Sequence, residues 1–179
     1  AKNATQDTTS IREIIMTCEN QVKGIDSLVT LLKTPVPKID LHQMYRLTMT
    51  HINTLISFSP DEITITQLKN SSEMRLIGNK QVSDSIIGYY STFESHVEQQ
   101  KFMMNFLQET LLLEIAAMDF GAMTNKKPTY TFDQRRYKEF FNRTLLFQSL
   151  MENEIGWMKD YQKQSISLLK LLKKEYKLE

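Results

Sequence analysis

The chain has 179 residues, of which 41% are hydrophobic and 24% charged, enough for one soluble domain with a sizeable core. Lys and Arg total 22 against 21 for Asp and Glu, so the chain has no overall basic field that would attract nucleic acid. The single cysteine, Cys18, excludes an intramolecular disulfide and a cysteine-based zinc site. We therefore expect one domain over residues 1–179, with no cofactor, no metal and no nucleic-acid partner.

The first predicted helix runs from about Ser10 to Lys33. Ser10 and Glu13 form a capping-box pattern, and apolar residues then recur at three- and four-residue steps. The "TPVP" sequence ends this helix, because proline cannot continue the helical hydrogen-bond ladder. The first ten residues lack the basic start and apolar middle of a signal peptide, which suggests that the chain is cut from a longer protein. We expect residues 1–9 to be disordered or a linker.

A second, shorter helix is predicted after Asp40, which can serve as its N-cap, and the "SFSP" sequence closes it. The next segment, Asp61 to Ser71, fits either a short helix or an extended entry, since its "ITIT" run is β-branched.

Two long helices follow. Asn79 is a good N-cap for a helix over about 80–119, residues 120–132 read as a connecting loop, and Asp133 caps a helix that ends near 177. Long helices joined by a short loop fold back as an antiparallel hairpin. The predicted fold class is all-α, an elongated up-and-down bundle built on the hairpin of 80–119 and 133–177 and covered by the shorter N-terminal helices.

The Gly78-Asn79-Lys80 sequence resembles part of a phosphate-binding loop. That loop requires a second glycine upstream and Ser or Thr after the lysine, whereas Gln81 follows here. We therefore interpret Gly78 as a residue with an unusual backbone angle and Asn79 as a helix cap.

A polar layer is predicted where the two long helices face each other. If the hairpin turns near Lys126, residues whose numbers sum to about 252 lie opposite each other, which places His96 and Gln100 near Gln148 and Glu152. Such a layer would fix the register of the helices, or it would line a small-ligand or proton-sensing site. The candidate residues for this layer or pocket are His96, Gln100, Glu152, Trp157 and Tyr161.

Other chemistry-bearing residues favour structural roles. None of the three histidines has the spacing of a helical-bundle metal site, and Cys18 reads as a small buried hydrophobe. Several aromatic residues fall at similar height on the two long helices, which favours core packing over a ligand cage: Tyr89, Tyr90, Phe93, Trp157 and Tyr161. The C-terminal "KLLKKEYKLE" is basic and amphipathic, which suits either anionic lipid or a solvated helix end.

The segment Thr64 to Glu94, "TITQLKNSSEMRLIGNKQVSDSIIGYYSTFE", resembles a pattern of small single-pass membrane proteins from Bacteroidetes-type bacteria. That family has no assigned function. The pattern is Thr-x-x-x-Leu-x-Ser-Ser/Gly, then Leu-Arg-Leu-Ile, then Asn-Lys-x-Leu-x-x-x-Ile-x-x-Tyr-Tyr. It is matched at Thr66 or Thr64, Leu68, Ser71, Arg75, Leu76, Ile77, Asn79, Lys80, Ile86 or Ile87, Tyr89 and Tyr90. Glu73 and Met74 depart from it, because the family often has Gly before Leu-Arg-Leu-Ile.

The resemblance implies an extracytoplasmic helical domain, on the periplasmic side of the inner membrane, anchored by a span upstream of this fragment. It supplies no catalytic residues. We therefore expect a non-enzymatic domain with a structural, protein-interaction or sensory role, soluble as this fragment, with an unidentified protein partner or a homodimer. The alternative is a small-ligand-sensing bundle with a pocket between the long helices.

Overall fold

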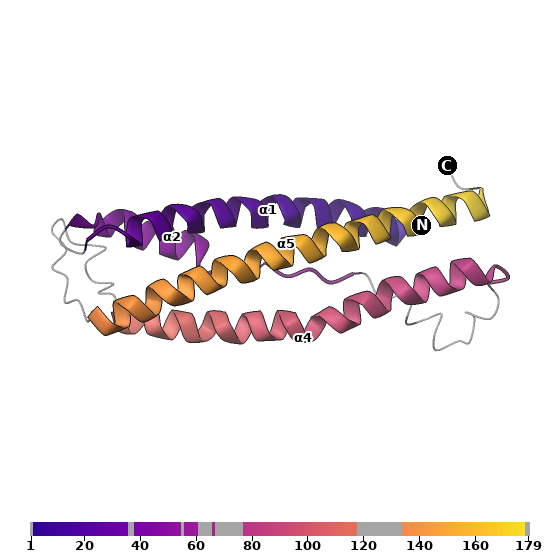
Figure 1. The fold of residues 1–179 in the computed structure, drawn as a ribbon. Helices are drawn as coiled ribbons and strands as arrows, with labels where there is room; N and C mark the ends of the chain where they lie inside the picture. Colours follow the sequence, from indigo (N-terminus) through magenta and orange to yellow (C-terminus); the bar gives the residue numbers. More distant parts are fainter. Residues whose placement is uncertain are drawn as a thin grey trace. The chain divides into compact units, whose positions relative to one another are not determined.

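The protein is all-α in the computed structural model, whose described part contains four helices and no strand (Figure 1). The helices are α1 (Lys2–Leu32), α2 (Leu41–His51), α4 (Lys80–Ala117) and α5 (Gln134–Tyr176). The structure describes residues 2–35, 38–54, 56–60, 66, 77–117 and 134–177. The predicted all-α helical bundle is therefore confirmed. The predicted element at 61–71, apart from residue 66, and the predicted loop at 120–132 with its Asp133 cap lie outside the described residues.

Both described N-caps are the predicted ones. The Asp40 carboxylate accepts a hydrogen bond from the Gln43 amide at 3.0 Å, and the Asn79 side chain accepts one from the Gln81 amide at 2.9 Å. Each bond satisfies an amide that the first helical turn leaves without an intrahelical partner. Gly78 does not take a left-handed backbone angle, so the predicted unusual conformation there is wrong.

The first helix begins at Lys2 and not near Ser10. Residues 2–9, which we expected to be disordered or a linker, are helical. The buried face of α1 extends one turn before Ser10, because Asp7 is buried four residues ahead of Ile11. Because Asp7 is polar, the apolar pattern of the sequence did not reveal that the buried face of α1 continues before Ser10.

Contacts divide the chain into two compact units, although we expected one domain. Unit 1 comprises Ala1–Met16, Ser57–Gln99 and Gly156–Glu179, and unit 2 comprises Thr17–Ile56 and Gln100–Ile155. The boundaries fall within α1, α4 and α5.

Within each unit, the segments of α4 and α5 run antiparallel in the predicted register. In unit 1, His96 stacks on Trp157, and the two residue numbers sum to 253. In unit 2, Glu109 pairs with Arg143 at 3.2 Å, where the numbers sum to 252. The predicted sum of about 252 is therefore confirmed inside each unit.

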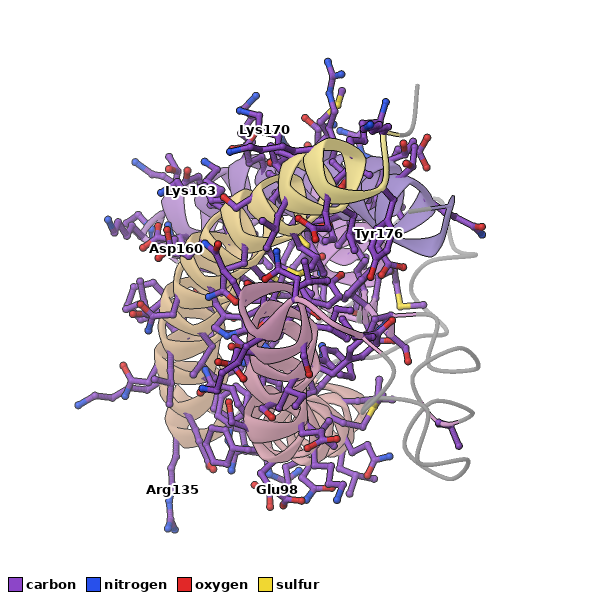
Figure 2. The ribbon with its side chains drawn as sticks, turned by 90° about the vertical axis from the view of Figure 1, so that its right-hand side faces the viewer. Glu98, Arg135, Asp160, Lys163, Lys170 and Tyr176 are labelled. Carbon is purple, nitrogen blue, oxygen red and sulfur yellow. The ribbon has the colours of Figure 1, made fainter. Side chains whose placement is uncertain are left out.

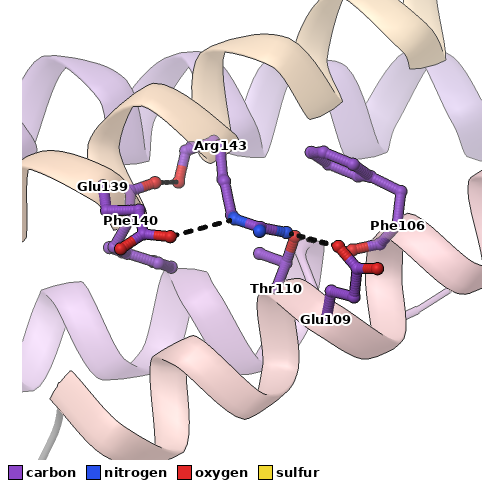
Figure 3. Close-up of polar contacts among 7 residues, drawn as sticks. Phe106, Glu109, Thr110, Glu139, Phe140 and Arg143 are labelled. Atoms are coloured by element: carbon purple, nitrogen blue, oxygen red, sulfur yellow. Dashed lines mark hydrogen bonds and ion pairs between the residues drawn. The ribbon is translucent and has the colours of Figure 1, made fainter. Parts of the chain in front are cut away.

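In unit 2, Arg143 joins α4 to α5 (Figure 3). Its guanidinium group lies 3.2 Å from the Glu109 carboxylate, 3.8 Å from that of Glu139, and over the Phe106 ring at 5.6 Å from the centroid. Glu109 is 65% exposed, so water weakens this ion pair. The ring contact adds a cation–π attraction that the carboxylate pairs alone do not supply.

The end of α2 is held against α1 by Gln21. The Gln21 side-chain amide donates to the carbonyl oxygens of His51 at 2.7 Å and Thr54 at 2.6 Å, which satisfies acceptors left open at a helix C-terminus. Gly24 lies one turn further along α1, and a Cβ atom built there would be 2.3 Å from the His51 ring. The absence of a side chain at Gly24 therefore allows the His51 ring to pack on α1.

Replacing Gly24 by alanine should destabilise the protein despite the better helix propensity of alanine. The added methyl group meets the His51 ring, and overpacking of this kind typically costs about 1–3 kcal/mol. Gly156→Ala is the matched control, because that glycine is also helical and nothing lies within 4 Å of its Cβ position. It should raise the free energy of unfolding by about 0.5–1 kcal/mol.

Denaturant unfolding of the two variants measures this difference. Adding His51→Ala to Gly24→Ala should restore much of the lost stability. Equal gains in stability for Gly24→Ala and Gly156→Ala would contradict the packing of the His51 ring on α1.

Candidate functional site

Four stacked rings form the centre of unit 1, and we call His96, Trp157, Tyr161 and Tyr89 the aromatic column. The His96 and Trp157 ring centroids are 3.5 Å apart with planes 7° from parallel. Trp157 stacks on Tyr161 at 4.9 Å and Tyr161 on Tyr89 at 4.5 Å, with planes within 13°. Two residues one turn apart on α5 are therefore flanked by two residues of α4. Parallel stacking at these separations leaves no room for a ligand between the rings.

Two phenylalanines enclose the aromatic column at its edge. Phe58 packs edge-on against Phe93 and Tyr161, with centroids 5.8 Å apart in both pairs. Phe93 also contacts Trp157. These contacts make the aromatic column part of the core of unit 1. The column is therefore a rigid element of that core.

A buried carboxylate lies at the Tyr89 end of the column. Asp7 of α1 is 4% exposed, and the Tyr89 hydroxyl donates a hydrogen bond to it at 2.9 Å. One residue further along α1, the hydroxyl groups of Thr8 and Ser165 share a hydrogen bond of 2.8 Å. Burying a carboxylate is unfavourable unless polar partners replace the lost water. The Tyr89 hydroxyl is therefore a required partner of Asp7 and not an incidental contact.

The tyrosines of the column act as neutral hydrogen-bond donors. Burial raises the pKa of Tyr89 far above its ordinary value, and the nearby Asp7 carboxylate adds to the effect. Burial also raises the pKa of Tyr161, and the neighbouring Tyr89 hydroxyl adds to the effect, followed by the charge of Asp7. The Tyr161 hydroxyl is buried and has no hydrogen-bond partner in the described part of the structure. Both groups stay protonated at physiological pH and are unsuited to act as bases or nucleophiles.

The structure brings together three of the five predicted site residues. His96, Trp157 and Tyr161 belong to the aromatic column, whereas Gln100 and Glu152 belong to unit 2. Glu152 is exposed, and the buried acid of that turn is Glu154, at 3% exposure. The sum of two residue numbers predicts which positions of a hairpin lie opposite each other, but it does not predict the direction in which their side chains point. A ligand pocket lined by these residues stays a prediction.

A groove runs between α4 and α5 in unit 1, with a volume of about 390 Å³. We call it the α4–α5 groove; its lining residues are Gln81, Ser85, Gly88, Tyr89 and Thr92 of α4, with Gln164, Ser167, Leu168 and Leu171 of α5. A Cβ atom at Gly88 would meet nothing within 4 Å, so the groove is open there. Small residues three and four positions apart on α4 were the sequence signal for this surface, and we did not predict it from them.

Lysine side chains border the groove on α5. At 100° per residue, Lys163, Lys170 and Lys174 fall within an arc of about 40°, next to Ser167 of the groove. All three are exposed, and Figure 2 shows Lys163 and Lys170 extending outward from α5. Lys163 pairs with Asp160 in a solvent-exposed contact, which is a weak interaction. We call these three residues the lysine row.

The remaining reactive groups lie away from this surface. Cys18 is buried in unit 2, as predicted, and burial followed by the charges of Glu154 and Glu19 raises the pKa of its thiol to about 11. Burial lowers the pKa of His51. The described residues contain no group of three or more His, Cys, Asp or Glu that could hold a metal ion. Among the described helices, none combines the length and apolar character needed to cross a bilayer.

Comparison of the chain with protein-family models, with curated proteins and with solved structures finds no match. The resemblance to a bacterial membrane-protein family stays a prediction.

Removing the Tyr89 hydroxyl should destabilise the protein far more than removing that of Tyr161. Tyr89→Phe removes one hydrogen-bond donor of the buried Asp7 carboxylate, and such a loss costs about 1–3 kcal/mol. Tyr161→Phe removes a hydroxyl without a partner and should leave stability unchanged or higher. Urea unfolding monitored by circular dichroism measures both. Similar losses for the two variants would contradict the assignment of Tyr89 as the donor to Asp7.

Cys18 should resist alkylation in the folded protein. Its folded pKa, about 11, exceeds the ordinary value of 9.0, so folding favours the neutral thiol. This contribution to stability is complete below pH 9 and is lost as pH rises through about 11. Labelling with iodoacetamide near pH 8 should be slow until denaturant is added, whereas the exposed variant Ser27→Cys on α1 should react at once. Equal labelling rates for both cysteines would show that Cys18 is accessible.

Proposed function

We propose that this chain is a non-enzymatic interaction domain that binds a protein partner through the α4–α5 groove. The observation that carries the proposal is the groove itself, which is open, lined by uncharged residues and flanked on α5 by the lysine row. Two polar groups beside the aromatic column are used within unit 1, since Asp7 accepts from Tyr89 and Thr8 bonds to Ser165. In the described part of unit 1, the α4–α5 groove offers space to another molecule, whereas the stacked aromatic column does not.

The proposal includes a location. We propose that the full-length protein holds this domain on the periplasmic side of a bacterial inner membrane through an upstream span. The support is the resemblance of the segment Thr64 to Glu94 to the family of single-pass membrane proteins.

A second candidate function is the sensing of a small ligand. The volume of the groove, about 390 Å³, falls within the range of small-molecule pockets, which starts at roughly 300 Å³. Such a ligand would bind against Tyr89, which lines the groove and also belongs to the aromatic column. The two candidates differ in whether a protein occupies the groove.

Site-directed cross-linking in cells that carry the full-length gene tests both parts of the proposal. Gly88→Cys places a thiol in the groove, and Gly156→Cys places one at an exposed helical position outside it. A membrane-impermeant maleimide with a photoreactive group should label both variants in cells whose outer membrane has been opened. On illumination, only the variant at position 88 should give a protein adduct.

Each contrary outcome would overturn one part of the proposal, either the periplasmic location or the protein-binding groove. Labelling only after complete lysis would overturn the periplasmic location. Labelling without an adduct at position 88, or with equal adducts at both positions, would overturn the protein-binding groove; an empty groove would leave small-ligand sensing as the better candidate.

A further inference from the structure

We propose that the occupant of the α4–α5 groove is an acidic amphipathic helix of the partner protein. This inference rests on the proposed function and adds the chemistry of the partner. It follows from the shape of the groove, from the state of its hydroxyl groups and from the position of the lysine row.

The shape of the groove suits a helix. Two neighbouring helices form its walls, and the wall on α4 includes small residues at Ser85, Gly88 and Thr92. Small side chains on one helix allow the axis of another helix to approach closely, toward the lower end of the usual separation of about 8–10 Å. Leu168 and Leu171 supply apolar surface on the α5 wall. A helix laid in such a groove buries the apolar side of an amphipathic sequence.

Two hydroxyl groups of the groove, those of Thr92 and Ser167, do not require polar partners from an occupant. Thr92 donates to the Gly88 carbonyl at 2.9 Å, and Ser167 donates to the Lys163 carbonyl at 2.8 Å. Because these donors are satisfied within their own helices, an apolar or small side chain can cover them at little cost. Gln81 and Gln164 leave amide groups in the groove for hydrogen bonds to polar side chains of the occupant.

Lys170 and Lys174 favour an acidic occupant beside the groove. The charge of Lys163 is already paired with Asp160, which lies one turn before Gln164 on the groove side of α5. Lys163 and Lys174 are eleven residue steps apart, so the lysine row extends over about 16 Å or three helical turns. Lys170 and Lys174 form no ion pair with a described residue, so their charges face solvent. Glu or Asp side chains repeating at three- and four-residue steps on one side of a bound helix would match this row.

Neither the helix dipole nor a membrane surface accounts for both the lysine row and the groove. The dipole favours cations in the last turn, where Lys173 and Lys174 lie, but its effect does not reach Lys163. An anionic membrane surface would attract the lysine row through the same charges. A flat surface cannot fill a groove open down to Gly88, so a lipid would leave the groove unused.

Synthetic peptides of about five helical turns test the inference. One carries Glu on its polar side and Ala and Leu on its apolar side, a second replaces Glu by Lys, and a third has the acidic composition in scrambled order. Each carries a fluorophore, and anisotropy during titration with the protein measures the dissociation constant. The acidic helix should bind, while the lysine and scrambled peptides should not.

Matched variants assign the binding to the groove. Gly88→Leu fills the groove and should weaken binding at least about tenfold, or about 1.4 kcal/mol. Gly156→Leu changes an exposed helical glycine outside the groove and should bind as the parent does. Both substitutions raise helix propensity, and thermal melts confirm that each variant is folded. The double variant Lys170→Glu and Lys174→Glu should also weaken binding. Its control is the double variant Lys23→Glu and Lys33→Glu, which changes the charge by the same amount on residues of unit 2 and should leave binding unchanged.

The outcomes separate this inference from the proposed function. Binding of the lysine peptide alone would overturn the acidic partner and leave a protein-binding groove. Binding of neither ordered peptide, with a cross-linked adduct still formed at position 88, would also overturn the partner chemistry only. Acidic binding that Gly88→Leu leaves unchanged would overturn the groove as its site. If phosphatidylglycerol vesicles bind the parent and Gly88→Leu alike and neither ordered peptide binds, the lysine row serves a membrane surface and the inference fails.

Discussion

The hydrogen bond from Tyr89 to Asp7 is the interaction on which unit 1 depends most. A carboxylate that is 4% exposed has lost its water, and the Tyr89 hydroxyl at 2.9 Å replaces part of it. The bond joins α1 to α4, and the adjacent bond between Thr8 and Ser165 joins α1 to α5. Apolar seams between long helices tolerate sliding, whereas a displaced buried acid would lose the hydrogen bond from Tyr89. This pair of bonds therefore specifies one register for the N-terminal turns of α1.

The same tyrosine connects the core of unit 1 to its surface. Tyr89 stacks on Tyr161 inside and lines the α4–α5 groove outside. Because the Tyr89 side chain is fixed in the core, the rotation of α4 about its own axis is fixed as well. That rotation places Gly88 and Thr92 on the groove. The aromatic column is thus a support for the binding surface, and the column residues need no chemistry of their own for the proposed interaction. In the proposed interaction, the lysine row supplies the charge that favours an acidic partner.

Local sequence signals predicted both described N-caps and the hairpin register correctly. Asp40 and Asn79 cap helices because short polar side chains reach amides two or three residues ahead, and that depends on nearby residues alone. The direction of side chains was harder to predict. Glu152 is exposed and Glu154 is buried, a difference of orientation that arises from packing between helices. The start of α1 was missed for a related reason, since Asp7 reads as a surface residue until its donor on α4 is known.

The most direct test of the central claim is a disulfide that reports the register of α1 on α5. Thr8→Cys with Ser165→Cys, in a chain carrying Cys18→Ala, places two thiols where hydroxyl oxygens lie 2.8 Å apart. Thr8→Cys with Leu169→Cys displaces the pair by one turn, about 6 Å along α5. Mild oxidation followed by gel electrophoresis under non-reducing conditions measures closure. We expect rapid closure of the first pair only; equal or faster closure of the displaced pair would contradict a register fixed by the buried polar bonds.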